Sequence, residues 1–139
     1  ANTLRRNERQ WSAVSLEELD EISEKMNLRV PLNAGDIGAN FCVSGANNFS
    51  KLPKGTIFKF DSGVELIVEE YNPPCLGMSK NLAQKILDKN GNVLDETLFL
   101  QVAKYLRGLV GVVEVPGIIH KNDEFLIIPY TSPRWAKNR

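Results

Sequence analysis

Short apolar segments separated by turn-forming residues are the feature that most limits what this chain can fold into. Segments rich in strand-forming residues lie at 10–14, 39–44, 56–60, 64–70, 109–115 and 124–129. Asp61-Ser62-Gly63 separates the third from the fourth, which is typical of a tight β-hairpin. The segments do not alternate regularly with helices, so a doubly wound sheet is disfavoured. Because closure removes exposed strand edges, the pattern predicts a mainly β fold with short helices (α+β), built on a closed or nearly closed β-barrel.

Helices are expected in three places. Ser15 and Glu18 have the Ser-x-x-Glu spacing of a capping box, and Val14 and Leu19 have the spacing of a hydrophobic staple. The helix that follows is expected to bury its apolar residues and to keep its acidic residues in solvent: Leu16, Leu19, Ile22 and Met26 inward, and Glu17, Glu18, Glu21 and Glu24 outward. A second helix is predicted over 79–89, with Asn90-Gly91 as the stop. The segment 97–106 suits a helix or, through Leu98-Phe99-Leu100, a strand, and the helix is favoured.

Cys75 is the most informative single residue. Pro73 and Pro74 end the preceding strand because they lack amide donors, and the chain after Cys75 leads into a predicted helix. A thiol just before a helix N-terminus feels the positive end of the helix dipole, which favours the thiolate. Cys75 is therefore a candidate nucleophile or soft-metal ligand, and the alternative is a small buried apolar side chain.

The second cysteine and the single histidine are weaker candidates. Cys42 lies within the predicted strand 39–44 and has no local activation, so we expect it to fill the core. His120 lies in a loop beside Lys121, and a surface position is favoured there over a catalytic role. The two cysteines lie 33 positions apart, without metal-ligand spacing, and no feature argues for a disulfide.

Charge gives little reason to expect a polyanionic partner. Seventeen Lys and Arg balance seventeen Asp and Glu, so binding to nucleic acid or to a membrane surface is not expected. Arg5, Arg6 and Arg9 form one small basic cluster. It is a candidate phosphate contact, although a solvated terminus, with Glu8 among the arginines, is the favoured interpretation.

Length and composition indicate one folded domain. The chain has 139 residues, of which 42% are hydrophobic and 24% charged, values typical of globular proteins. We expect a single domain over 1–139 with a core over about 7–130 and a polar tail at 131–139. The apolar runs are too short for a membrane span, and no secretory signal is recognised, so a cytoplasmic protein is expected.

Several blocks, in order, resemble one known family. They are Gly38-Ala39-Asn40-Phe41-Cys42-Val43-Ser44-Gly45, Leu52-Pro53-Lys54-Gly55-Thr56, Pro74-Cys75, and the runs 108–115 and 118–125, with Asn7-Glu8-Arg9-Gln10 upstream. Across 30–130 the sequence resembles the MOSC domain, named for the C-terminal part of molybdenum-cofactor sulfurases and found alone in small bacterial proteins. One departure is Ala39, which stands where the family often has a charged residue.

The resemblance implies a MOSC-type β-barrel in which Cys75 carries sulfur as a persulfide or ligates molybdenum. It further implies the molybdenum cofactor as a ligand. If this chain is a protein of that kind, we expect Arg9 to be an anion contact and Asn40, at a strand end, to orient a pocket by hydrogen bonds. A sulfur donor such as a PLP-dependent desulfurase would then be a partner, and a sulfur transferase or a cofactor-dependent activity would be the reaction class. The alternative is a non-catalytic small β-barrel binding module, which Cys75 reactivity would distinguish.

Overall fold

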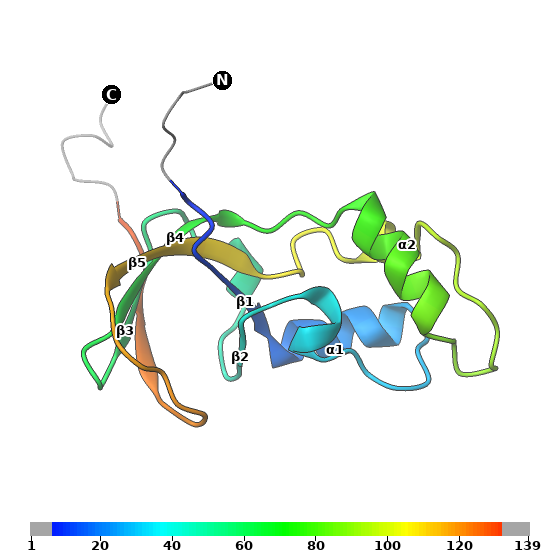
Figure 1. The fold of residues 1–139 in the computed structure, drawn as a ribbon, viewed down its shortest axis with the longest axis horizontal. Coiled ribbons are helices and arrows are strands. Elements are labelled where there is room, and N and C mark those ends of the chain that lie inside the picture. Colours follow the sequence, from blue (N-terminus) through cyan, green and yellow to red (C-terminus); the bar gives the residue numbers. More distant parts are fainter. Residues whose placement is uncertain (1–6, 132–139) are drawn as a thin grey trace, which may run out of the picture.

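The computed structural model describes residues 7–131 as a curled sheet with helices gathered at one side (Figure 1). The strands are β1 (Trp11–Ser15), β2 (Phe41–Val43), β3 (Ile57–Phe60), β4 (Glu65–Tyr71), β5 (Leu109–Val115) and β6 (Phe125–Ile128). The helices are α1 (Leu16–Lys25), α2 (Leu76–Lys85) and α3 (Leu98–Val102), with short 3₁₀ turns η1 (Ala34–Ile37) and η2 (Phe49–Lys51). The predicted mainly β fold with short helices is confirmed.

The six strands form one mixed sheet in the order β2-β1-β5-β4-β3-β6. Only the pairing of β1 with β2 is parallel; the other pairings are antiparallel. Irregular register between β4 and β5 helps to bend the sheet, because a bulge increases local twist. The result is a half-barrel whose two outer strands are β2 and β6, so the predicted barrel closes only in part.

Two apolar clusters hold the structure together. One lies inside the curve of the sheet, where Phe58 contacts the rings of Trp11, Phe49 and Phe125. The other lies under the helices and joins Val14 at the end of β1 to apolar residues of α1, α2 and α3. Because β1 passes directly into α1, it contributes to both clusters and links the sheet to the helices.

The start of α1 follows the sequence prediction only in part. Ser15 caps the helix, and its Oγ accepts a hydrogen bond from the Glu18 backbone N–H at 3.3 Å. The reciprocal half of the predicted capping box is wrong, since the Glu18 carboxylate turns inward to Ser50 and is only 8% exposed. Leu16, predicted to be buried, is 47% exposed, while Val14 and Leu19 share one apolar cluster, as the staple spacing predicts.

The second helix begins earlier than predicted. It starts at Leu76 rather than Ser79, so Cys75 itself is the N-cap, and it ends at Lys85 rather than Lys89. Asn90-Gly91 does not cap it; the Gly91 N–H instead closes a separate turn onto the Asp88 carbonyl oxygen. The helix predicted over 97–106 is shorter and covers Leu98–Val102.

The predicted tail and membrane properties are tested only in part. Within the described part of the chain, no helix is long and apolar enough to cross a membrane. The predicted polar tail lies outside the described residues except for Thr131. Arg5 and Arg6 of the basic cluster also lie outside them.

Candidate functional site

Cys75 lies at the junction of a proline-bounded loop and the N-terminus of α2. Its backbone is extended, and its Sγ accepts a hydrogen bond from the Met78 N–H at 3.4 Å, as an N-cap side chain does. The thiol is exposed and forms no disulfide. The alternative that Cys75 is a buried apolar side chain is therefore wrong.

Arg107 is the second side chain of the site, and it comes from the segment that leads into β5. Its Nη1 donates to the Pro73 carbonyl oxygen at 2.9 Å and lies 3.9 Å from Cys75 Sγ. The guanidinium also lies over the Phe99 ring, 6.0 Å from its centroid. These contacts hold a positive charge beside the thiol.

The surroundings of Cys75 favour its thiolate. The hydrogen bond from the Met78 backbone makes the largest contribution and lowers the pKa of the Cys75 thiol below its ordinary value. Desolvation acts in the opposite direction, whereas the hydrogen bond and charge of Arg107 lower the pKa further. Exposure together with a lowered pKa is the combination found in reactive cysteines.

Arg9 lies next to the loop that precedes Cys75. Its Nη2 donates to Asn72 Oδ1 at 2.7 Å, and its Nη1 lies 3.5 Å from Glu70 Oε1. Asn72 immediately precedes Pro73 and Pro74, so Arg9 contacts the segment that carries the thiol. Its charge is shared with Glu70, and its side chain remains 53% exposed.

Asn40 lies at the entry to β2 and joins that strand to β1. Its Oδ1 accepts hydrogen bonds from the Ser12 backbone N–H at 2.7 Å and from Ser12 Oγ at 3.3 Å. The Asn40 N–H in turn donates to the Ser12 carbonyl oxygen. The side chain that we expected to orient a pocket thus forms hydrogen bonds between two strands.

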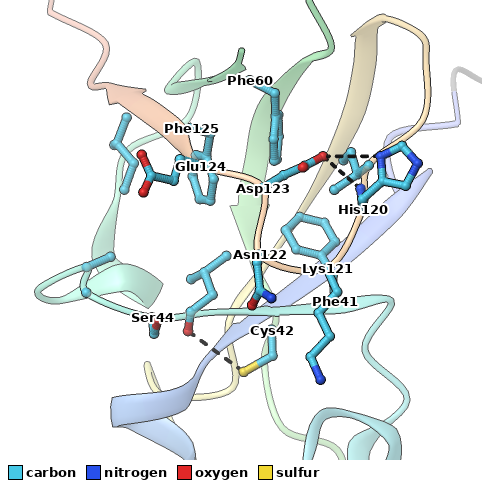
Figure 2. A pocket seen from close by; sticks show the side chains of 15 residues that line it. Phe41, Cys42, Ser44, Phe60, His120, Lys121, Asn122, Asp123, Glu124 and Phe125 are labelled. Atoms are coloured by element: carbon cyan, nitrogen blue, oxygen red, sulfur yellow. Dashed lines mark hydrogen bonds and ion pairs between the residues drawn. The ribbon is translucent and has the colours of Figure 1, made fainter. Parts of the chain in front are cut away.

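A cavity of about 950 Å³ lies elsewhere, between the outer strands β2 and β6. Figure 2 shows Asn122 and Lys121 extending from the loop before β6 toward the strand that carries Cys42. Phe41, Phe60 and Phe125 supply its aromatic lining. Cys75 does not line this cavity, nor a second one of about 410 Å³ beside Glu70, Tyr71 and Tyr105.

Cys42 is exposed at this cavity, so its predicted place in the core is wrong. β2 is an outer strand of three residues, and side chains alternate between the two faces of a strand. Val43 is therefore buried, whereas Cys42 is exposed. Partial burial makes the largest contribution and raises the pKa of the Cys42 thiol, and Glu17 and Asp20 raise it further. The two thiols are therefore shifted in opposite directions.

His120 is a surface residue, as expected. Its side chain is 75% exposed and its Nδ1 lies 3.7 Å from Asp123 Oδ2. Among residues 7–131, no three His, Cys, Asp or Glu side chains form a group that could hold a metal ion.

Sequence reasoning missed Arg107 and Glu18. Arg107 has no local signal, because its contact with Cys75 joins positions 32 residues apart. Glu18 matched an acidic solvated face by its spacing, and only the tertiary contact with Ser50 shows otherwise.

The match to a known family is shown by comparison with other proteins. The family model described as the MOSC domain matches residues 2–125 of this chain. The chain belongs to the MOSC domain family. The family predicted from the sequence blocks is thus confirmed.

One curated relative of this MOSC chain comes from Bacillus subtilis (strain 168) and is named "Putative metal-sulfur cluster biosynthesis proteins YuaD". The two sequences are 34% identical over 124 residues, which is 89% of this chain and 62% of the relative. The chain thus spans about three-fifths of the length of that protein. The crystal structure of the Bacillus subtilis YuaD protein is similar with a TM-score of 0.83 and 32% identity, over 93% of this chain and 69% of that one.

Proposed function

We propose that this MOSC protein accepts and passes on sulfur, with Cys75 as the carrier. The observation that carries the proposal is an exposed thiol at the N-cap of α2 whose pKa is lowered by the Met78 N–H and by Arg107. A sulfur acceptor needs a thiolate that a partner can reach, and an exposed thiol with a lowered pKa supports this role for Cys75. The family and the naming of the Bacillus subtilis relative for metal-sulfur cluster biosynthesis support sulfur chemistry of this kind.

The transfer step is a thiol exchange at a persulfide. The Cys75 thiolate attacks the outer sulfur of a donor persulfide, R–S–SH, and forms a new S–S bond as the donor S–S bond breaks. The donor leaves as the thiolate R–S⁻, so no external oxidant or reductant is required. A desulfurase cysteine that carries a persulfide is a donor of the required chemical class.

Arg107 has a defined role in this step. The new terminal sulfur is acidic and bears negative charge, and the nearest guanidinium nitrogen lies 3.9 Å from the sulfur to which it is attached. An adjacent cation stabilises such an anion. Arg9 adds a second positive group next to Asn72, at the start of the same loop.

The residues present do not fit a retained molybdenum cofactor. Cys75 is a soft ligand of the kind that suits molybdenum, but it lines neither described cavity. Arg9, the expected anion contact, is engaged by Asn72 and Glu70, and Asn40 is engaged by Ser12. The sulfur transfer proposed for Cys75 does not involve the cofactor.

The experiment is sulfur loading followed by cyanolysis. The purified protein is incubated with a small-molecule persulfide, freed of excess reagent and treated with cyanide, and the thiocyanate released is measured. Wild type and Cys42→Ser are expected to release about one sulfur per chain, whereas Cys75→Ser releases none, because a hydroxyl cannot carry a persulfide. Equal release from Cys75→Ser and wild type would show that Cys75 is not the carrier, and no release from either would favour the non-catalytic module.

A further inference from the structure

Glu18 is a buried carboxylate that the sulfur chemistry does not use. It is 8% exposed, and it accepts hydrogen bonds from the Ser50 hydroxyl at 2.7 Å and from the Ser50 backbone N–H at 3.1 Å. Removing a carboxylate from water is costly unless hydrogen-bond donors satisfy it. The two hydrogen bonds therefore fix the positions of Glu18 and Ser50 relative to each other.

Ser50 also contacts Gly108, the residue directly before β5. Because its hydroxyl proton points to Glu18, its oxygen lone pairs are available, and they accept the Gly108 N–H at 2.8 Å. The Gly108 carbonyl oxygen accepts the Asn72 N–H at 2.9 Å. Both backbone polar groups of Gly108 are thus fixed.

Gly108 packs closely against the backbone of β1. Its φ is +100°, and a Cβ at this position would lie 1.9 Å from the Ala13 carbonyl oxygen. The peptide that joins residues 107 and 108 is therefore held from the Ser50 side by a hydrogen bond and from the β1 side by close packing.

Both arms of the Cys75 site begin at Gly108, one through its N–H side and the other through its carbonyl oxygen. Arg107 directly precedes Gly108 and reaches back to Pro73 and Cys75. Asn72, bound to the Gly108 carbonyl oxygen, begins the loop that ends at Cys75. Displacement of the peptide would move the cation and the thiol relative to each other.

We propose that Glu18 and Ser50 are positioning residues for the Cys75 site, which hold the 107–108 peptide and thereby keep the Arg107 guanidinium beside the thiol. The inference deepens the proposed function and rests on it for its biological meaning, but the contact that it concerns is measurable without sulfur transfer. Neither residue touches the reacting sulfur.

The test measures the rate of Cys75 alkylation by iodoacetamide against pH in a Cys42→Ser background, where one thiol remains. Both Ser50→Ala and Glu18→Gln are expected to move the profile to higher pH. Ser50→Ala should slow the reaction at neutral pH by about two- to fivefold, which is the effect of losing one partly exposed charge contact. Glu18→Gln, which keeps an acceptor for the Ser50 N–H, is expected to change the rate in the same direction by less. Glu17→Gln is the matched control, since Glu17 lies on the same helix but accepts from the Gly45 N–H. Its profile should match that of the Cys42→Ser parent.

Arg107→Gln decides whether the effect passes through the guanidinium. In that background, adding Ser50→Ala should produce no further change in the profile. An unchanged profile in folded Ser50→Ala and Glu18→Gln, or an equal slowing with and without Arg107, would overturn the proposal. Circular dichroism and thermal midpoints establish folding, and if Ser50→Ala fails to fold, Glu18→Gln decides the outcome.

This design separates the inference from the proposed function. If the protein loads no sulfur but the variants show the expected shifts in the pH profile, the positioning role of Glu18 and Ser50 stands and the carrier role of Cys75 is wrong. If Cys75 loads sulfur but the alkylation profiles of Ser50→Ala and Glu18→Gln are unchanged, the carrier role stands and the positioning role is wrong.

Discussion

The guanidinium of Arg107 lies 3.9 Å from the Cys75 sulfur, although the two residues are 32 positions apart in the chain. The same nitrogen donates to the Pro73 carbonyl oxygen, so one side chain fixes the proline-bounded loop and places positive charge at the thiol. The acidity of Cys75 thus depends on a local helix start and on a tertiary contact together.

The first prediction concerns the relative reactivity of the two thiols. Cys75 should be alkylated faster than Cys42 at neutral pH, because both are exposed while the pKa of Cys75 is lowered and that of Cys42 is raised. Competitive labelling with isotopically distinct iodoacetamides, read peptide by peptide, measures the ratio. Equal rates at the two positions would refute the assignment of Cys75 as the activated thiol.

A second prediction concerns the cap of α1. Ser15→Ala should lower the free energy of unfolding by roughly 1 kcal/mol, because the Glu18 N–H loses its acceptor. Urea denaturation of the variant and wild type measures the difference. A midpoint unchanged within error would show that the Ser15 hydroxyl contributes nothing to the helix start.

The third prediction concerns Gly108. Gly108→Ala should cost more than about 3 kcal/mol or prevent folding, since a left-handed φ is combined with a Cβ position 1.9 Å from a carbonyl oxygen. Gly63→Ala is the matched control, because Gly63 has φ +98° with no atom within 4 Å of the added Cβ. The control should cost roughly 1–2 kcal/mol. Similar thermal midpoints for the two variants would show that a Cβ at position 108 does not clash with Ala13.

The fourth prediction concerns pH and the buried carboxylate. Burial, the largest contribution, raises the pKa of Glu18 above its ordinary value of 4.5. Its contribution to stability is therefore complete below the unfolded-state pKa and is lost as pH rises through the higher folded-state pKa. The free energy of unfolding of wild type, minus that of Glu18→Gln, should be larger in acid than at neutral pH.

Glu17 provides the control with the opposite sign. The Gly45 backbone hydrogen bond makes the largest contribution and lowers the pKa of Glu17, so its contribution is present above 4.5 and is lost as pH falls. The corresponding difference for Glu17→Gln should shrink in acid. Urea titrations of wild type and both variants from acid to neutral pH measure these differences. The account is contradicted if the difference between wild type and Glu18→Gln grows toward neutral pH.

Elements set by local sequence were predictable. The β3–β4 hairpin follows from turn residues between two β-rich segments, and the Ser15 cap follows from residue type and spacing. The exposed position of Cys75 at a helix start agrees with the local features that made it a candidate, namely the prolines before it and the helix after it. The helix boundary was misplaced because Leu76-Gly77-Met78 gives no strong helical signal, so the N-cap role of Cys75 itself was not predicted.

Features set by tertiary contacts were not predictable. The burial of Glu18 depends on Ser50, which is 32 positions away, and the exposure of Cys42 depends on β2 being an outer strand of the sheet. Hydrophobic periodicity carries no information about strand order or about which polar group meets which. For the same reason, no pattern in the sequence pointed to Arg107 as a partner of Cys75.

The most direct measurement of the central claim is peptide-level mass spectrometry of the protein after incubation with a persulfide donor and without reductant. The account predicts a mass increase of one sulfur atom on the peptide that contains Cys75, with the Cys42 peptide unmodified and the increase reversed by dithiothreitol. Sulfur on the Cys42 peptide alone, or on neither peptide while the donor remains competent toward a control thiol, would contradict the account.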